Sequence, residues 1–116
     1  MRVHHRLILT ISIMLCSHMT WAASFDCASA RLSTEKQICQ VRSLSDADVK
    51  LSTTYYILLK AVPMGFRDQQ KSQQSIWLKS RNDCQKNTKC IAKAYYQRQA
   101  ELDQLLQQRV LSKGPF

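Results

Sequence analysis

The fold is decided by one stretch of the sequence, Trp77-Leu78-Lys79-Ser80-Arg81-Asn82-Asp83-Cys84-Gln85-Lys86-Asn87-Thr88-Lys89-Cys90-Ile91-Ala92-Lys93-Ala94-Tyr95. Its middle, Gln85-Lys86-Asn87, is a polar turn between two cysteines, and Asn87 or Thr88 can cap a following helix. Apolar residues recur at helical spacing on both sides of this turn. We therefore predict an antiparallel helical hairpin that runs from about Phe66 to about Val110, with its tip bracketed by Cys84 and Cys90.

Apolar residues define the inner faces of the predicted helices. The second helix of the hairpin carries Ile91, Ala94, Tyr95, Leu102, Leu105 and Leu106 on one face. A helix that precedes the hairpin carries Leu51, Tyr55, Leu58, Leu59 and Val62 at spacings of three and four, and it ends at Pro63 and Gly65. The first helix of the hairpin has only a narrow apolar stripe. Trp77, Tyr55 and Tyr95 are the expected core anchors.

Capping signals place the start of two helices before the hairpin. Thr34 followed by Gln37 has the spacing of a capping box, which predicts a short helix there. Ser45 is the expected cap of the next helix, with Asp46 and Asp48 in its first turn. Glycine and proline occur only twice each. The sequence thus predicts an all-α fold, a small bundle of one short and three longer helices.

The N-terminal segment has the pattern of an export signal. Its first six residues include two arginines, the apolar run Leu7 to Leu15 follows, and small residues occur at Thr20, Ala22 and Ala23. A run of nine apolar residues is far shorter than the ~20 of a membrane-spanning helix, so a permanent anchor is the weaker alternative. We expect a signal peptide over residues 1–23, cleavage after Ala22 or Ala23, and one helical domain over 24–116.

Cys16 opens a second possibility for the N-terminus. A cysteine just after the apolar run is where a lipoprotein carries its lipid. The residue before it is the bulky Leu15, whereas lipoprotein signals have a small residue there. We therefore favour a free protein in the periplasm or outside the cell, with lipidation at Cys16 as the alternative.

The remaining four cysteines predict two disulfides. Cys27, Cys39, Cys84 and Cys90 are an even number in a chain bound for an oxidising compartment. Eleven residues separate the first two and five separate the last two, unlike the tight pairs of structural zinc sites, so no metal is expected. Four cysteines permit three pairings. We favour Cys27 with Cys39 and Cys84 with Cys90, because each closes a short local loop.

The predicted domain is strongly basic. Without Arg2 and Arg6 the chain keeps 15 lysines and arginines against 8 aspartates and glutamates, a formal charge of +7. The basic residues around the hairpin tip are the candidate binding residues: Lys79, Arg81, Lys86, Lys89 and Lys93. Such a patch favours an anionic partner, either a protein or an envelope polymer. Alternatively, these lysines only form a solvated helix end and bind no partner. Nucleic acid is not expected, since export separates the chain from it.

Arg81 has an alternative to a binding role. It lies four residues after Trp77, on the same helix face, so it could stack on the indole or pair with Asp48, Glu35 or Glu101. The internal ion pair is the favoured interpretation. The tyrosine pairs at 55–56 and 95–96 each direct one ring inward and one outward, and the outward rings are alternative interface anchors.

Catalytic groups are scarce in the predicted domain. All three histidines lie in the leader, the four cysteines are expected to be paired, and no glycine-rich phosphate loop occurs. The carboxylates occupy positions expected for caps and surface pairs. We therefore predict neither an enzyme nor a bound cofactor.

Several motifs in order resemble a known family. They are Phe25-Asp26-Cys27, Glu35-Lys36-Gln37-Ile38-Cys39, Leu44 with Leu51 and Tyr55, Trp77 to Cys84, and Cys90-Ile91-Ala92-Lys93-Ala94-Tyr95. Together they resemble the N-terminal domain of the lysozyme inhibitor LprI-like family, over roughly residues 25–105. The resemblance implies an exported helical domain with paired cysteines that inhibits a lysozyme or another peptidoglycan hydrolase. The alternative is a non-inhibitory envelope protein whose basic surface binds anionic polymer.

Overall fold

The structure is a computed structural model that describes residues 23–115. It contains four α-helices, α1 (Ser33–Gln40), α2 (Arg42–Ala61), α3 (Met64–Asn82) and α4 (Thr88–Arg109), and the short 3-10 helices η1 (Cys27–Ser29) and η2 (Leu111–Lys113). No strand occurs within the described range. The prediction of an all-α fold with one short and three longer helices is confirmed. The predicted leader, including Cys16, lies outside the described residues except for Ala23.

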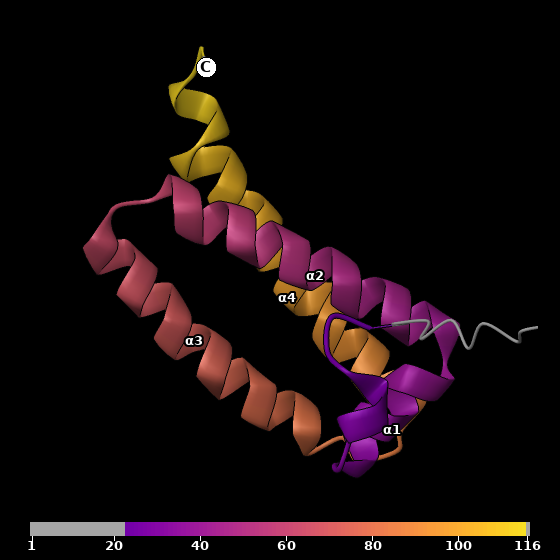
Figure 1. The fold of residues 1–116 in the computed structure, drawn as a ribbon. Coiled ribbons are helices and arrows are strands. Elements are labelled where there is room, and N and C mark those ends of the chain that lie inside the picture. The colour runs from indigo at the N-terminus through magenta and orange to yellow at the C-terminus, as the bar shows by residue number, and fades with distance from the viewer. Residues whose placement is uncertain (1–22, 116) are drawn as a thin grey trace, which may run out of the picture.

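The three long helices do not pack equally closely. α2 and α4 make the most extensive contact, whereas α3 leans away from α2 (Figure 1). α3 and α4 run antiparallel and are joined by the turn at Cys84–Cys90, as predicted. The short α1 lies against this end of the hairpin, which places the first described residues beside the tip.

The hydrophobic core lies between α1, α2 and α4. Its most deeply buried apolar side chains are Ile38, Leu44, Leu51, Leu58, Ile91, Tyr95 and Leu102. α3 supplies none of these, and its buried residues are the polar Gln70 and Arg81. Phe66 and Trp77 of α3 pack only partly buried against the core. α3 therefore depends on polar contacts to its neighbours, which agrees with its high content of Gln, Lys and Ser.

Two predicted helix caps are wrong. α2 begins at Arg42, and the buried Ser45 hydroxyl donates a 2.6 Å hydrogen bond to the carbonyl of Ile38 in α1. Thr34 lies inside α1, and its hydroxyl donates to the carbonyl of Asn82 at 3.0 Å. The Glu35 carboxylate instead accepts hydrogen bonds from the backbone amides of Arg31 and Leu32, just before α1. Both hydroxyls form tertiary bonds, which compete with the local capping that their positions suggest.

Both predicted disulfides are present. Cys27 is bonded to Cys39, which ties η1 to α1, and Cys84 is bonded to Cys90 across the turn. In this turn Gln85 has φ 51°, the left-handed conformation that commonly ends a helix. The predicted cap of α4 is also confirmed, because the Asn87 side chain accepts a 3.0 Å hydrogen bond from the Cys90 amide.

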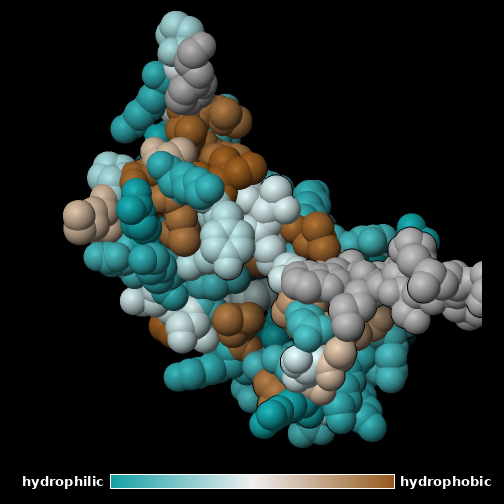
Figure 2. All heavy atoms as spheres, viewed as in Figure 1, coloured by the Kyte–Doolittle hydropathy of each residue, from teal (hydrophilic) through white to brown (hydrophobic). Residues whose placement is uncertain are grey.

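The surface differs between the two ends of the bundle. Hydrophilic side chains cover the end with α1 and the Cys84–Cys90 turn, while apolar side chains gather where α2 passes into α3 and α4 ends (Figure 2). Among residues 23–115, no helix combines the length and apolar character that crossing a membrane requires.

Candidate functional site

The Cys84–Cys90 turn and its exposed lysines form one end of the bundle, which we call the tip (the turn with Lys79, Lys86, Lys89 and Lys93). Lys79, Lys86, Lys89 and Lys93 are all exposed. Behind them, α1 is bonded to both sides of the turn, through Thr34 and through a 2.9 Å hydrogen bond from Gln37 Nε2 to Thr88 Oγ1. The disulfide and these two bonds hold the lysines on a rigid support.

Arg81 does not belong to the exposed tip. It is only 4% exposed, and its guanidinium lies 3.9 Å from Asp48 Oδ1, so the internal ion pair anticipated for it is present. The arginine also lies over the Trp77 ring, 5.6 Å from its centroid. The assignment of Arg81 to the binding patch is therefore corrected. The Trp77 face of α3 points into the bundle, where Arg81 meets Asp48 of α2 and Tyr95 of α4.

Asp48 is the centre of a buried polar network. Its Oδ1 accepts a 2.7 Å hydrogen bond from the Tyr95 hydroxyl, and its Oδ2 accepts a 2.7 Å hydrogen bond from the Ser24 amide. Arg81 in turn donates to the Tyr95 oxygen at 3.0 Å. Burial, opposed by Arg81, raises the pKa of Tyr95 above its ordinary value, which keeps the hydroxyl protonated as the donor to Asp48. The network joins α2, α3 and α4 to Ser24, which lies near the start of the described residues.

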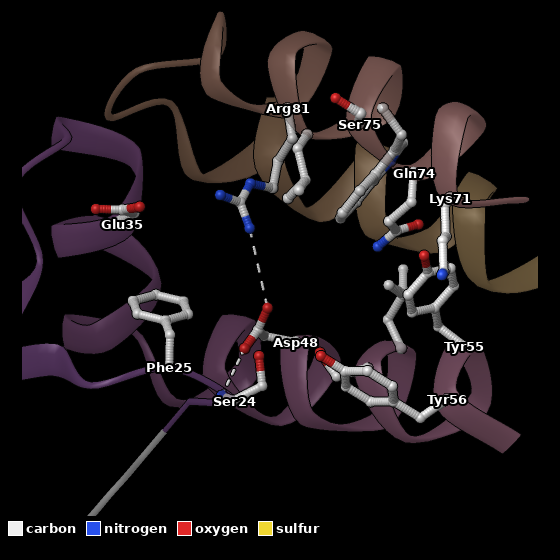
Figure 3. Close-up of a pocket in the computed structure, with 14 residues that line it drawn as sticks. Ser24, Phe25, Glu35, Asp48, Tyr55, Tyr56, Lys71, Gln74, Ser75 and Arg81 are labelled. Atoms are coloured by element: carbon white, nitrogen blue, oxygen red, sulfur yellow. Dashed lines mark hydrogen bonds and ion pairs between the residues drawn. The ribbon is translucent and has the colours of Figure 1, made fainter. Parts of the chain in front are cut away.

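A cleft of about 490 Å³ lies between α2 and α3, next to this network. Lys71, Gln74 and Arg81 extend from α3 toward α2, while Tyr55 and Tyr56 extend from α2 (Figure 3). Phe25 and Glu35 line the end nearest α1. The Asp48–Arg81 ion pair lies between the tyrosine end of the cleft and the end with Phe25 and Glu35. The two charges of the pair cancel. The cleft thus combines aromatic rings with hydroxyl, amide and single charged groups.

The three predicted anchors occupy different environments. Tyr95 is buried in the core. Trp77 is half-buried, in an edge-to-face contact with Tyr95 at 5.3 Å between ring centroids, and its Nε1 donates to the Ala94 carbonyl at 3.2 Å. Tyr55 is also only half-buried, because α3 leans away from it and leaves the cleft. Burial raises the pKa of its hydroxyl.

The outward tyrosines lie on separate surfaces. Tyr56 is 60% exposed and lines the α2–α3 cleft, whereas Tyr96 is 78% exposed and lines a smaller groove between α2 and α4. The prediction that one ring of each pair faces outward is confirmed. Because their surfaces differ, the two rings can serve as matched probes of each other.

The chain matches no protein-family model, no curated protein and no solved structure. Within residues 23–115, no three His, Cys, Asp or Glu side chains gather as a metal site would require. Two surfaces are candidate sites: the tip, which the sequence predicts, and the cleft, which it does not. A signal for the cleft exists, since Lys71, Gln74, Ser75 and Leu78 repeat at spacings of three and four on α3. This spacing indicates that the four side chains share one face of α3. It does not show that α2 is far enough from this face to leave a cleft.

Proposed function

We propose that the protein is an exported binding protein of the LprI-like kind, which inhibits a lysozyme or another peptidoglycan hydrolase through its tip. The observation that carries the proposal is the tip itself. Four exposed lysines surround a disulfide-closed turn that α1 supports from behind. A surface that is already ordered loses little conformational entropy when it docks.

The chemistry of the target favours a lysine-rich inhibitor. Glycosidases place two carboxyl groups beside the scissile bond, so their catalytic clefts carry negative charge. Lysine ammonium groups at the tip would complement these carboxylates and block the cleft. The formal charge of +7 repels basic hydrolases at long range. We therefore expect the target to be an enzyme with an acidic surface.

The resemblance to the LprI-like family supports the same proposal. Trp77, Arg81, Cys84, Cys90 and Tyr95 all belong to the motifs that carry it, and they lie in or beside the tip. Arg81 and Tyr95 belong to the polar network, Trp77 packs against both of them, and the two cysteines close the turn. These motif residues are thus suited to supporting the tip, while the exposed lysines between them would contact the partner.

Charge reversal at the tip tests this role. Changing Lys86 and Lys89 together to glutamate is expected to weaken inhibition of a susceptible hydrolase at least tenfold, about 1.4 kcal/mol, because attraction becomes repulsion. The measurement is the rate of cell-wall lysis at increasing concentrations of the protein. Helix content, from circular dichroism, should remain unchanged because both lysines are exposed.

A matched control carries the same change of charge elsewhere. Lys60, near the end of α2, and Lys113 in η2 are exposed and distant from the tip in sequence and structure (Figure 1). The Lys60→Glu, Lys113→Glu variant should inhibit like the unchanged protein. If both double variants lose the same activity, net charge and not the tip determines binding.

A second candidate function is binding to anionic envelope polymer without an enzyme target. It is favoured by the excess of free positive charge, since only Arg42, Arg81 and Arg98 form ion pairs with carboxylates in the described residues. Salt separates the two functions. Binding to a polyanion should fall steeply between about 50 and 200 mM salt, whereas a fitted protein interface should be less sensitive.

Export is part of the proposal and has its own test. N-terminal sequencing of the protein from a periplasmic or culture fraction is expected to begin at Ala23 or Ser24, because the small residues Thr20 and Ala22 suit signal peptidase. The two disulfides are consistent with an oxidising compartment. An intact Met1 in the cytoplasm, or lipid on Cys16, would refute this prediction.

A further inference from the structure

We propose that the α2–α3 cleft is a second binding site, separate from the tip, and that it takes a neutral oligosaccharide of the kind that forms the glycan of the cell envelope. The choice of an envelope glycan rests on the proposed export, whereas the site itself does not. The cleft extends from Lys71 to Arg81 along α3, roughly 15 Å at 1.5 Å per helical residue. Its volume of about 490 Å³ is in the range of small-molecule sites.

Two sets of contacts fix the position of α3 relative to α2 along the cleft. Near the turn between α2 and α3, Arg67 donates hydrogen bonds to the carbonyls of Leu59 at 2.7 Å and Val62 at 3.3 Å. Near the tip, Arg81 is paired with Asp48. Between these points, α3 is bonded to α4 and not to α2, through Trp77 and through a 3.1 Å hydrogen bond from Arg98 Nε to Gln74 Oε1. The site is therefore preformed.

The charge of the cleft differs from that of the rest of the molecule. Arg81 is neutralised by Asp48, which leaves Lys71 and Glu35 as one positive and one negative lining group. In a domain of charge +7, a cleft without excess positive charge is poorly suited to a polyanion. Its ligand should therefore be uncharged.

The lining groups match the two faces of a sugar. A pyranose ring has an apolar C–H face, which packs on aromatic rings, and a rim of hydroxyl groups. Tyr55 and Tyr56 offer rings on the α2 side, and the Gln74 amide extends toward them from α3, with its Oε1 bonded to Arg98 and its Nε2 as a donor (Figure 3). Tyr56 is the most exposed of these rings, so it is available to a ligand without disturbing the core.

Calorimetric titration of the purified protein with two neutral probes, the β-1,4-linked tetramer of N-acetylglucosamine and maltotetraose, tests the site. Saturable binding of at least one sugar is expected. Tyr56→Ala should weaken it at least tenfold, and Tyr96→Ala, the matched control on the α2–α4 groove, should leave it unchanged. Absence of binding for both sugars at millimolar concentration overturns the proposal, as does equal loss in the two tyrosine variants.

Two further outcomes separate this site from the tip. The Lys86→Glu, Lys89→Glu variant should bind the sugar as well as the unchanged protein does, even if it no longer inhibits a hydrolase. Loss of sugar binding in that variant would move the site to the tip and overturn the proposal. Displacement of the sugar by polyphosphate would show an anion site and overturn it too. Failure of hydrolase inhibition alone leaves the sugar site standing.

Discussion

Replacing Arg81 with methionine is expected to lower the free energy of unfolding by about 3–5 kcal/mol. The change leaves the Asp48 carboxylate buried without its ionic partner and removes a donor to Tyr95. Methionine has an unbranched apolar stem of similar length, but it removes the guanidinium that lies over the Trp77 ring. In a domain of this size the melting temperature should fall by roughly 4–8 °C per kcal/mol, which thermal unfolding followed by circular dichroism would measure.

The control for Arg81 is Arg42, which forms an exposed ion pair. Its Nε lies 3.9 Å from Asp46 Oδ2, the same separation as in the buried pair, but its side chain is 94% exposed. Arg42→Met should cost no more than about 0.5 kcal/mol, because solvent screens the pair. Adding Asp48→Asn to Arg81→Met should recover part of the loss. If Arg81→Met is as stable as Arg42→Met, the buried network does not hold α3.

Reduction of both disulfides is expected to unfold most of the protein at 37 °C. The cross-links join residues 12 and 6 apart, and closing loops of this size stabilises a domain by roughly 2–3 kcal/mol each. Their sum is comparable to the lower range of stability for about 93 residues, ~5 kcal/mol. Far-ultraviolet circular dichroism with and without a thiol reductant would show the loss of helix.

Single-pair variants separate the two contributions. Cys84→Ser with Cys90→Ser should lower the melting temperature and leave the Cys27–Cys39 disulfide intact, because the two loops do not share residues. Mass spectrometry after alkylation would count the remaining thiols. Two free thiols in the native, unmodified protein, or full helix content after complete reduction, would contradict a structural role for the cross-links.

The sequence by itself determined the class of fold and its local connections. The spacing of apolar residues identifies side chains that are buried in the core, because helical periodicity places them on one face of each helix. Examples are Leu51 and Leu58 in α2 and Ile91 and Leu102 in α4. The short intervals between cysteines also predict the observed pairing, and the Asn87 cap precedes α4 as expected. All these features depend on residues close together in the chain, where the backbone geometry of a helix or turn leaves few alternatives.

Only the tertiary structure decided what each helix face meets. Ser45 and Thr34 have the local pattern of helix caps. In the structure their hydroxyls instead donate to carbonyls of other segments, Ile38 for Ser45 and Asn82 for Thr34. Arg81 looks like part of a basic patch until Asp48, 33 positions earlier, is placed opposite it. Tyr55 is half-buried because α3, which is poor in apolar residues, packs more closely on α4 than on α2. This arrangement leaves a cleft beside α2. Periodicity fixes which side chains share a face, whereas long-range packing decides whether that face is covered.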